Sequence, residues 1–408
     1  MPKKILIGPF KQLLPLSGLP LKGALKDEQL TIINNGGLLV SEGKILKIGL
    51  YGGLKSEADE IESIDHPTVC LPGLVDAHTH ICFGGSRAHD YALRNAGKSY
   101  LEIAKAGGGI WDTVTKTRQA PEEVLVKNTL KQCERHLKNG VTTLEVKSGY
   151  GLSVDEELKM LRAIKKANET SAQDLIATCL AAHMVPKDWS GTAKGYLEEI
   201  GNELFPVLKS EGLAHRIDAF VEESAYSPSQ IRPYFEKAQA MGFDITVHAD
   251  QFSTGGSQIA VEVGAVSADH LEASTDKEIA LLAKSNTVAT ALPGASIGLG
   301  CAFTPARKLL DAGACLAIAS DHNPGSAPMG NLLAQASILG TFEKLSNAEV
   351  LAGITQRAAA ALNLNDRGVL EAGKKADFTL FPTDNYQEIT YHQGQLKPSM
   401  VYKNGLLA

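Results

Sequence analysis

The hydrophobic pattern between residues 70 and 321 alternates between short apolar runs and longer segments with helical periodicity. Each apolar run is almost uniformly hydrophobic, as expected for a strand that is buried on both faces. The helical segments follow residues that favour a helix start, namely Pro121, Ser153, Ser227 and Ser274. The eight strand-like runs are 70–78, 141–149, 175–183, 217–224, 244–250, 265–272, 287–294 and 315–321. The pattern predicts a parallel (β/α)8 barrel of the TIM type, with a doubly wound sheet as the alternative.

The two ends of the chain have a different pattern. Residues 4–68 contain short strand-like runs separated by Gly, Asn and Ser, without a clear helical segment, and the residues beyond Asn363 return to the same composition. We therefore expect residues 1–68 and 366–408 to form one small β-sandwich domain beside a barrel domain at residues 69–365.

Active residues of a TIM barrel lie at the C-terminal ends of its strands. Of the eight runs, only the seventh, which ends in Pro293 and Gly294, lacks a residue suited to metal binding or proton transfer. The others end in His78 and His80, Lys147 with Tyr150, His183, Glu222 with Glu223, His248 with Asp250, Asp269 with His270, and Asp321 with His322. Any one of these would be interpreted as a capping or surface residue, but their recurrence at the same strand end favours a functional site.

Four of these residues form a candidate metal site. His78 and His80 are two positions apart, so a strand would direct both imidazoles to the same face. With His248 and Asp321 they make a set of three nitrogens and one oxygen, which suits Zn²⁺ and also Fe²⁺ or Mn²⁺. Such a metal lowers the pKa of its water toward about 7. Asp321 is the candidate to accept the water's proton, and His270 to polarise a carbonyl or stabilise an oxyanion.

Composition narrows the class of partner. The chain has 408 residues, 44% of them hydrophobic, and a modest net charge of −6 with both signs spread along it. This argues against a nucleic-acid or membrane partner and favours a small molecule. The six cysteines show no Cys-x-x-Cys spacing, and eighteen consecutive apolar residues occur nowhere, so we expect reduced core cysteines and a cytoplasmic protein.

The opening motif PGLVDAHTH (72–80) resembles that of the metal-dependent amidohydrolase superfamily, and further segments resemble its imidazolonepropionase family, the hydrolases of histidine degradation. KSGYGL and DHNPGSAP are far more specific than the opening motif. The matching segments are FGGSR (83–87), AGGGI (106–110), EVKSGYGL (145–152), HADQFS (248–253), SADHLE (267–272), LPGA (292–295) and ASDHNPGSAPMG (319–330).

The resemblance implies hydrolysis of the ring amide of 4-imidazolone-5-propanoate to N-formimidoyl-L-glutamate, with one divalent metal ion, Zn or Fe, and a homodimer as the expected assembly. An Arg suits the substrate because it grips a carboxylate with two charge-assisted hydrogen bonds. The implied substrate-binding residues are Arg87 and Tyr150 at the propionate, His183 and Gln251 at the ring, and Asn323, Gly325 and Ser326 at the opened product or the substrate carboxylate.

Gln251 affects the expected assignment of the general base. Some members of the family have Glu at the position of Gln251, and because Gln cannot act as a general base, proton transfer would depend on Asp321 with His270.

Lys147 affects the expected number of metal ions. Lysines at barrel strand ends of related hydrolases can be carboxylated and bridge two metals. The sequence around Lys147 resembles that of the one-metal subgroup, so we expect an electrostatic or structural role for Lys147.

Two other functions stay open from the sequence. A deaminase or cyclic amidase of the same superfamily, acting on a nucleobase-like ring, would share the metal site but would not need Arg87 and Tyr150. A non-catalytic metal-binding or small-molecule-binding barrel would lack an open coordination position. Turnover and metal content distinguish these from the hydrolase.

Overall fold

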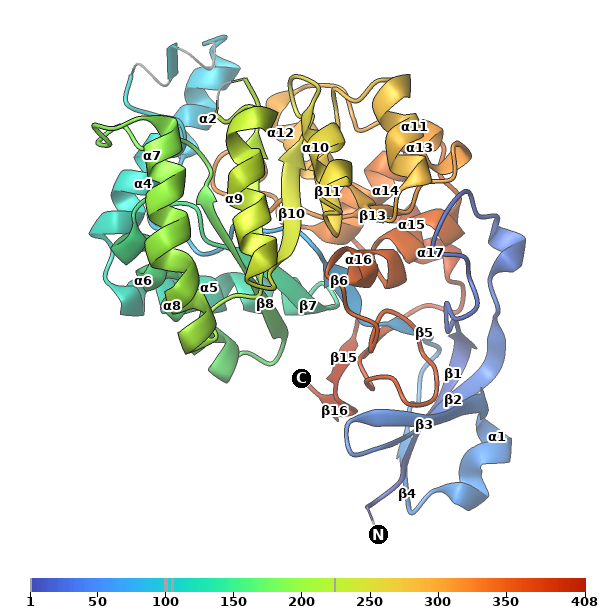
Figure 1. The fold of residues 1–408 in the computed structure, drawn as a ribbon. Coiled ribbons are helices and arrows are strands. Elements are labelled where there is room, and N and C mark those ends of the chain that lie inside the picture. Colours follow the sequence, from blue (N-terminus) through green and yellow to red (C-terminus); the bar gives the residue numbers. More distant parts are fainter. Residues whose placement is uncertain (1, 99–101, 104–105, 224) are drawn as a thin grey trace.

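The computed structural model describes residues 2–98, 102–103, 106–223 and 225–408. Figure 1 shows a larger body of strands surrounded by helices and a smaller β body beside it, where both chain termini lie. The last residue of the strand predicted at 217–224 falls outside the described part.

The small body is a single mixed sheet built from both ends of the chain. Its strand order is β16-β15-β14-β5-β1-β2-β3, and β4 pairs with β1. Phe10, Phe378 and Tyr402 pack together in its core. The pairing of the two chain ends is therefore confirmed. The strands are β1 (Ile5–Leu13), β2 (Ile33–Ser41), β3 (Lys44–Leu50), β4 (Glu60–Ser63), β5 (Val69–Pro72), β14 (Phe378–Phe381), β15 (Met400–Lys403) and β16 (Leu406–Leu407).

Three short helical turns lie in the N-terminal part where the sequence pattern indicated strands alone. They are η1 (Asp27–Gln29), α1 (Tyr51–Leu54) and η2 (Lys55–Glu57). Tyr51 and Leu54 of α1 pack on Leu6 and Leu39 of the sheet, so α1 covers part of one sheet face.

The large body is the predicted barrel. Its strands are parallel and follow the order of the chain without interruption. Nearly every residue of these strands is buried, which accounts for their uniform hydrophobicity in the sequence. The strands are β6 (Leu74–Asp76), β7 (Val141–Lys147), β8 (Asp174–Ala182), β9 (Arg216–Val221), β10 (Asp244–Ala249), β11 (Ser267–His270), β12 (Val288–Ala291) and β13 (Leu316–Ile318).

The barrel closes between β6 and β13 through the residues that follow these strands. Thr79 forms a parallel bridge with His322. The Asp321 backbone N–H donates to the His78 carbonyl at 3.0 Å, and the His80 N–H donates to the His322 carbonyl at 2.8 Å. Closure of the barrel therefore places His78 and His80, which follow β6, next to Asp321, which follows β13.

The strand predicted at 70–78 is two strands in different sheets. β5 pairs with β1 and β14 of the small sheet, whereas β6 pairs with β7 of the barrel. Gly73 lies at the break, and a Cβ placed there would come within 2.3 Å of the Thr142 hydroxyl. Only glycine allows this close approach, and an apolar pattern alone does not reveal a change of sheet partner.

The predicted helices are present, with one start displaced. Ser153 and Ser227 cap their helices by accepting from Glu156 N and Gln230 N, as the sequence indicated. The helix expected after Ser274 instead has Thr275 as its cap. The helices of the barrel are α2 (Ala88–Asn95), α4 (Ile110–Gln119), α5 (Glu122–Leu137), α6 (Val154–Thr170), α7 (Ala193–Glu199), the π-helical turn η3 (Ile200–Leu204), α8 (Phe205–Glu211), α9 (Pro228–Ala240), α10 (Gly256–Glu262), α11 (Asp276–Lys284), α12 (Pro293–Leu299), α13 (Ala306–Asp311), α14 (Leu332–Glu343), α15 (Asn347–Gly353) and α16 (Gln356–Ala361), while α17 (Gln387–Tyr391) lies in the C-terminal segment.

Five of the six cysteines are buried and all are unpaired, but Cys301, just after α12, is exposed. The expectation that every cysteine lies in the core was therefore wrong at Cys301. Its short loop segment is hydrophobic in sequence, and hydrophobicity without periodicity does not say which residues face solvent.

Asp174, at the start of β8, joins the barrel to the C-terminal segment. Its Oδ2 atom lies 2.5 Å from Arg367 Nη1, 2.7 Å from Lys375 Nζ and 2.9 Å from Lys403 Nζ. Burial acts to raise the pKa of Asp174, but these three cations outweigh burial and hold the pKa below its usual value. The carboxylate therefore stabilises the folded state in its charged form.

We expect Asp174→Asn to lower the free energy of unfolding at pH 7 by about 1.5–3 kcal/mol, the usual contribution of hydrogen bonds to a charged group. Because the folded-state pKa is lowered, this stabilisation is present above the unfolded-state pKa of about 3.9 and is lost as the pH falls. Denaturant unfolding at a series of pH values measures the difference. The matched control, Asp276→Asn, removes an exposed pair with Lys308 and should change stability by less than about 1 kcal/mol. Equal losses in both variants would contradict the assignment.

Candidate active site

Three histidine side chains converge at the C-terminal end of the barrel. His78 and His80 follow β6, and His248 is on β10. The Nε2 atom of His80 lies 3.2 Å from that of His78 and 3.3 Å from that of His248. Asp321, after β13, places its Oδ1 atom 3.7 Å from His78 Nε2 and 3.5 Å from His80 Nε2. The structure thus brings all four predicted ligands together, each of them buried.

Carboxylates behind the cluster set the orientation of two imidazoles. His78 Nδ1 lies 2.7 Å from Asp269 Oδ2, and His248 Nδ1 lies 2.9 Å from Asp218 Oδ2. An Nδ1–H that faces a carboxylate leaves Nε2 with a free lone pair. Burial lowers the pKa of His78, His80 and His248 well below the usual value, so the rings are neutral.

Neutral imidazoles whose lone pairs face one another repel unless a cation lies between them. Nitrogens bound tetrahedrally to zinc at about 2.0–2.1 Å lie roughly 3.3 Å apart. The separations of 3.2 and 3.3 Å fit this value. His78, His80 and His248 therefore form a group that can hold a metal ion.

Asp321 and His270 lie beside the cluster. Burial raises the pKa of Asp321 to about 7, although the nearby His270 and a hydrogen bond with Asn323 act in the opposite direction. The ring of His270 lies 5.3 Å from that of His248, and its Nδ1 atom is 3.4 Å from Glu272 Oε1. Burial acts to lower the pKa of His270, but Glu272, Asp321 and Asp269 together outweigh burial and raise it. In its protonated form an imidazole can donate a hydrogen bond to a developing oxyanion.

The backbone is strained at the C-terminal ends of three of the barrel strands, next to the site. Asp250 directly follows β10, His270 ends β11 and Asp321 comes three residues after the end of β13, and their φ values are 52°, 87° and 49°. Non-glycine residues rarely adopt positive φ, and such strain concentrates at active sites. The turn directs the side chain of Asp321 toward the histidines.

Arg87 and Gly325, both predicted to bind substrate, lie in contact. A Cβ on Gly325 would come within 2.2 Å of Arg87 Nη1, so a side chain at this position would displace the guanidinium. Arg87 Nε donates to Asp90 Oδ2 at 2.8 Å, and the same oxygen accepts from Gly109 N. The AGGGI segment therefore helps to hold Arg87.

Tyr150 and His183 lie beside the histidine cluster, and the charge of Arg87 acts on the pKa of both side chains. The Tyr150 ring is 5.6 Å from that of His183 and 6.0 Å from that of His80. His183 donates from Nδ1 to the Gly149 carbonyl at 2.9 Å, which leaves its Nε2 for a ligand. Burial lowers the pKa of His183 to about 4, so this ring is neutral.

Asn323 and Ser326 shape the loop after β13. Asn323 Oδ1 accepts from Gly325 N and Ser326 N at 2.8 Å, and its Nδ2 donates to the Asp321 carbonyl. These contacts build the loop that carries Gly325 to Arg87. The hydrogen bonds of Asn323 are thus within the loop, and its predicted contact with a ligand stays a prediction.

Gln251 lies two residues beyond β10 and is partly buried. Glu222 holds its loop, since it accepts from Phe252 N at 2.9 Å and from the Ser253 hydroxyl. Asp250 accepts from Ser257 N and from the Ser274 hydroxyl. Glu222 and Asp250, both noted in the sequence as strand-end acids, therefore anchor loops and do not point at the metal cluster.

Asp218 was missed by the sequence interpretation. It lies inside β9, and its side chain faces His248 from within the barrel. A signal was present, because IDAFV places one acidic residue in an otherwise apolar strand. Buried carboxylates require a partner, so such a residue marks a polar contact inside the barrel.

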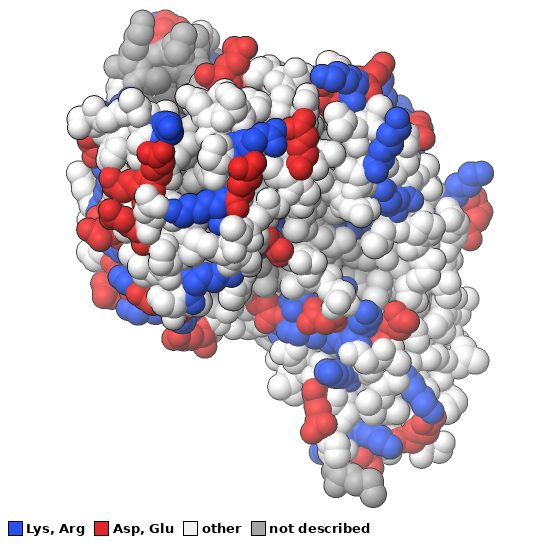
Figure 2. Space-filling view, viewed as in Figure 1, with Lys and Arg blue, Asp and Glu red and all other residues white. Residues whose placement is uncertain are grey.

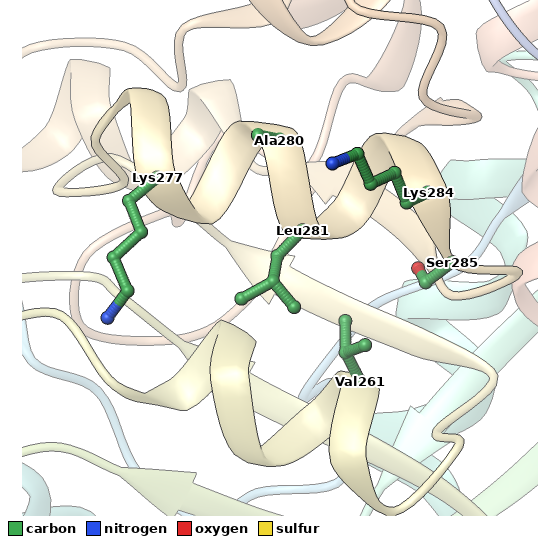
Figure 3. A pocket seen from close by; sticks show the side chains of 6 residues that line it. All are labelled: Val261, Lys277, Ala280, Leu281, Lys284 and Ser285. Atoms are coloured by element: carbon green, nitrogen blue, oxygen red, sulfur yellow. The ribbon is translucent and has the colours of Figure 1, made fainter.

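The surface offers a separate pocket. It lies between α10 and α11 and is lined by Val261, Lys277, Ala280, Leu281, Lys284 and Ser285 (Figure 3). None of the strand-end residues discussed above lines it, so it is distinct from the site. On the face shown in Figure 2, basic and acidic side chains are interspersed.

Comparisons with known proteins agree with this geometry. The profile of the amidohydrolase family matches residues 69–407. The chain belongs to the amidohydrolase family. This amidohydrolase is 38% identical over 403 residues to the imidazolonepropionase of Geobacillus sp., covering 97% of this chain and 95% of the relative. It is 40% identical over 383 residues to the imidazolonepropionase of Bacillus mycoides, with 93% and 90% covered.

Solved structures of more distant proteins share the fold of this amidohydrolase. A zinc complex of atrazine chlorohydrolase from Arthrobacter aurescens superposes with a TM-score of 0.71 at 16% identity, covering 99% of this chain and 94% of that one. A zinc-bound adenosine deaminase from Xanthomonas campestris gives 0.73 at 18% identity, with 99% and 92% covered. The barrel and the additional sheet therefore occur together in known hydrolases, and the predicted fold class is confirmed.

Proposed function

We propose that this amidohydrolase is an imidazolonepropionase, which hydrolyses the ring amide of 4-imidazolone-5-propanoate to N-formimidoyl-L-glutamate in histidine degradation. The observation that carries the proposal is the match to imidazolonepropionases over nearly the entire chain. The position of Tyr150 beside His80, with the charge of Arg87 acting on Tyr150 and His183, supports this substrate, because the propionate needs a cation near the reacting amide.

The proposed metal ligands are His78, His80, His248 and Asp321, and the proposed metal is one divalent ion, zinc or iron. Three imidazole nitrogens and one carboxylate oxygen suit both ions. When bound, the ion supplies the nucleophile by lowering the pKa of a coordinated water. Asp321, within 3.7 Å of two of the histidines, can both help to hold an ion and accept a proton.

The two proposed catalytic residues have different roles: Asp321 transfers protons and His270 stabilises the developing negative charge. Asp321 takes a proton from the attacking water and passes it to the ring nitrogen that leaves as the C–N bond breaks. His270, held by Glu272, donates to the carbonyl oxygen as negative charge develops there. Gln251 has no acid or base function in this scheme, because an amide does not titrate in this range.

The remaining proposed contacts orient the substrate. Among the hydrogen bonds of the described residues, Arg87 uses Nε for Asp90, so its two Nη groups can grip the propionate. Tyr150 donates to the same carboxylate, while His183 and Gln251 contact the ring. Gly325 and Ser326, on the loop built by Asn323, would bind the product or the substrate carboxylate.

The proposed setting of the enzyme is the cytoplasm, and the proposed assembly is a homodimer. In the described part of the chain, no helix is long and apolar enough to cross a membrane. The histidine-degradation substrate is a small, water-soluble molecule.

A direct assay tests the function. The purified protein loaded with zinc or iron should convert 4-imidazolone-5-propanoate to N-formimidoyl-L-glutamate, and removal of the metal by a chelator should abolish the conversion. Loss of substrate absorbance with product detection by mass spectrometry measures this. A nucleobase or a propionate-free cyclic amide turned over at a higher kcat/KM would favour the alternative deaminase or cyclic amidase. Tight metal binding without turnover of any of these substrates would favour a binding protein.

A further inference from the structure

A buried lysine lies directly behind the histidine cluster. The side chain of Lys147, at the end of β7, is inaccessible to solvent. Its Nζ atom lies 2.8 Å from Glu145 Oε2, 2.8 Å from Asp218 Oδ2 and 3.9 Å from Asp269 Oδ2. One ammonium group therefore faces three buried carboxylates.

Two of these carboxylates also hold the histidines, and they use the same oxygen atoms for both contacts. Asp218 Oδ2 is 2.8 Å from Lys147 Nζ and 2.9 Å from His248 Nδ1. Asp269 Oδ2 is 3.9 Å from Lys147 Nζ and 2.7 Å from His78 Nδ1. Lys147 is thus connected to two of the three imidazoles through a single carboxylate oxygen each.

The buried carboxylates behind the histidines depend on Lys147 for charge balance. The second cation nearby, Arg216, places Nε 3.6 Å from Glu145 Oε1. Glu145 therefore keeps a cationic neighbour without Lys147, whereas the ion pairs of Asp218 and Asp269 given by the structure involve Lys147 and a histidine alone. Removing one partner from a buried ion pair leaves an uncompensated charge, which is strongly unfavourable.

We propose that Lys147 is a positioning residue for metal binding. Its ammonium group holds the Asp218 and Asp269 carboxylates where they accept from Nδ1–H of His248 and His78, so that both Nε2 atoms face the metal position. The inference rests on the metal site proposed above. It extends the general observation that groups behind the ligands determine ligand orientation and metal affinity.

The same contacts identify the chemical form of Lys147. Burial acts to lower the pKa of Lys147, but Asp218, Glu145 and Asp269 outweigh burial and raise it. The side chain is therefore an ammonium ion. A carboxylated lysine would be an anion placed among three carboxylates, and like charges at these distances repel strongly.

The test measures zinc affinity without substrate, by competition between the protein and a chromophoric chelator. We expect Lys147→Met to bind Zn²⁺ about 10- to 100-fold more weakly than the wild type, the usual effect of losing such a supporting group. The matched control is Lys159→Met on α6, which removes another lysine ion pair, with Glu156, away from the cluster. Its zinc affinity should equal that of the wild type.

A double variant separates charge from packing. Lys147→Met combined with Glu145→Gln removes one positive and one negative charge. The net charge of the buried groups behind the histidines is therefore the same as in the wild type. If Lys147 acts through its charge, the double variant should recover at least about threefold of the lost affinity, a coupling of about 0.65 kcal/mol. An affinity at or below that of Lys147→Met would show that Lys147 only fills space and would overturn the proposal.

A spectroscopic measurement of the histidine tautomers tests the same proposal independently. It uses the variant Lys147→Gln, so it remains possible if Lys147→Met does not fold. Long-range ¹H–¹⁵N spectra of the metal-free protein report which ring nitrogen carries the proton. His78 and His248 should be Nδ1–H tautomers in the wild type and mixed in Lys147→Gln, which keeps a similar length without the charge. Unchanged tautomers and unchanged zinc affinity in Lys147→Gln would overturn the inference. Weak zinc binding by the wild type itself would instead refute the proposed metal site.

Discussion

Asp321→Asn is expected to lower kcat by about 10²- to 10⁴-fold, the range of general acid–base catalysis, while the chain stays folded. The amide has nearly the size of the carboxylate but cannot accept the proton of the attacking water, and it is a weaker metal ligand. Asn also tolerates the left-handed backbone at this position, where φ is 49°. Alanine would lack that local preference, so Asp321→Asn separates chemistry from folding better than an alanine variant.

Steady-state kinetics on protein of known metal content, with thermal unfolding as the folding control, measures this effect. The matched control is Asp250→Asn, because Asp250 also follows a barrel strand with positive φ but hydrogen-bonds to Ser257 and Ser274. Its loss of kcat should be at least tenfold smaller than that of Asp321→Asn. A wild-type rate in fully metallated Asp321→Asn would rule out Asp321 as the proton acceptor.

The second large effect is expected at Arg87. Arg87→Ala should lower kcat/KM for 4-imidazolone-5-propanoate by about ten- to hundredfold, because losing hydrogen bonds to a charged group costs roughly 1.5–3 kcal/mol. Arg87→Lys should lose less, since it keeps the charge but not the forked geometry. Tyr150→Phe should also lose less, since it removes one neutral donor and keeps the packing of the ring.

An analogue that lacks the propionate distinguishes binding from structure. Wild type and Arg87→Ala should process or bind this analogue almost equally, because the missing contact is the one to the carboxylate. Arg87 also pairs with Asp90, which accepts from Gly109 N, so a structural role would affect both ligands alike. Equal losses toward both ligands would remove the main physical support for the substrate assignment.

The sequence alone determined the barrel, because uniformly apolar runs alternate with capped helical segments. Local chemistry was sufficient to predict the helix starts at Ser153 and Ser227. Their hydroxyls accept hydrogen bonds from backbone N–H groups of the first helical turn. The grouping of His78 and His80 was also predictable, since positions two apart on an extended chain share a face. These features depend on residues that are near one another in the chain.

Only the tertiary structure decided how distant residues meet. The pairing of Thr79 with His322 closes the barrel and brings Asp321 to the histidines, yet the bridged positions are far apart in sequence. The change of sheet at Gly73 depends on Thr142 coming close, which an apolar pattern cannot reveal. Asp218 was not identified from the sequence, and the electrostatic or structural role expected for Lys147 had no partners until the barrel placed both residues behind His248. Long-range contacts and buried charge pairing therefore completed the site that local periodicity had located.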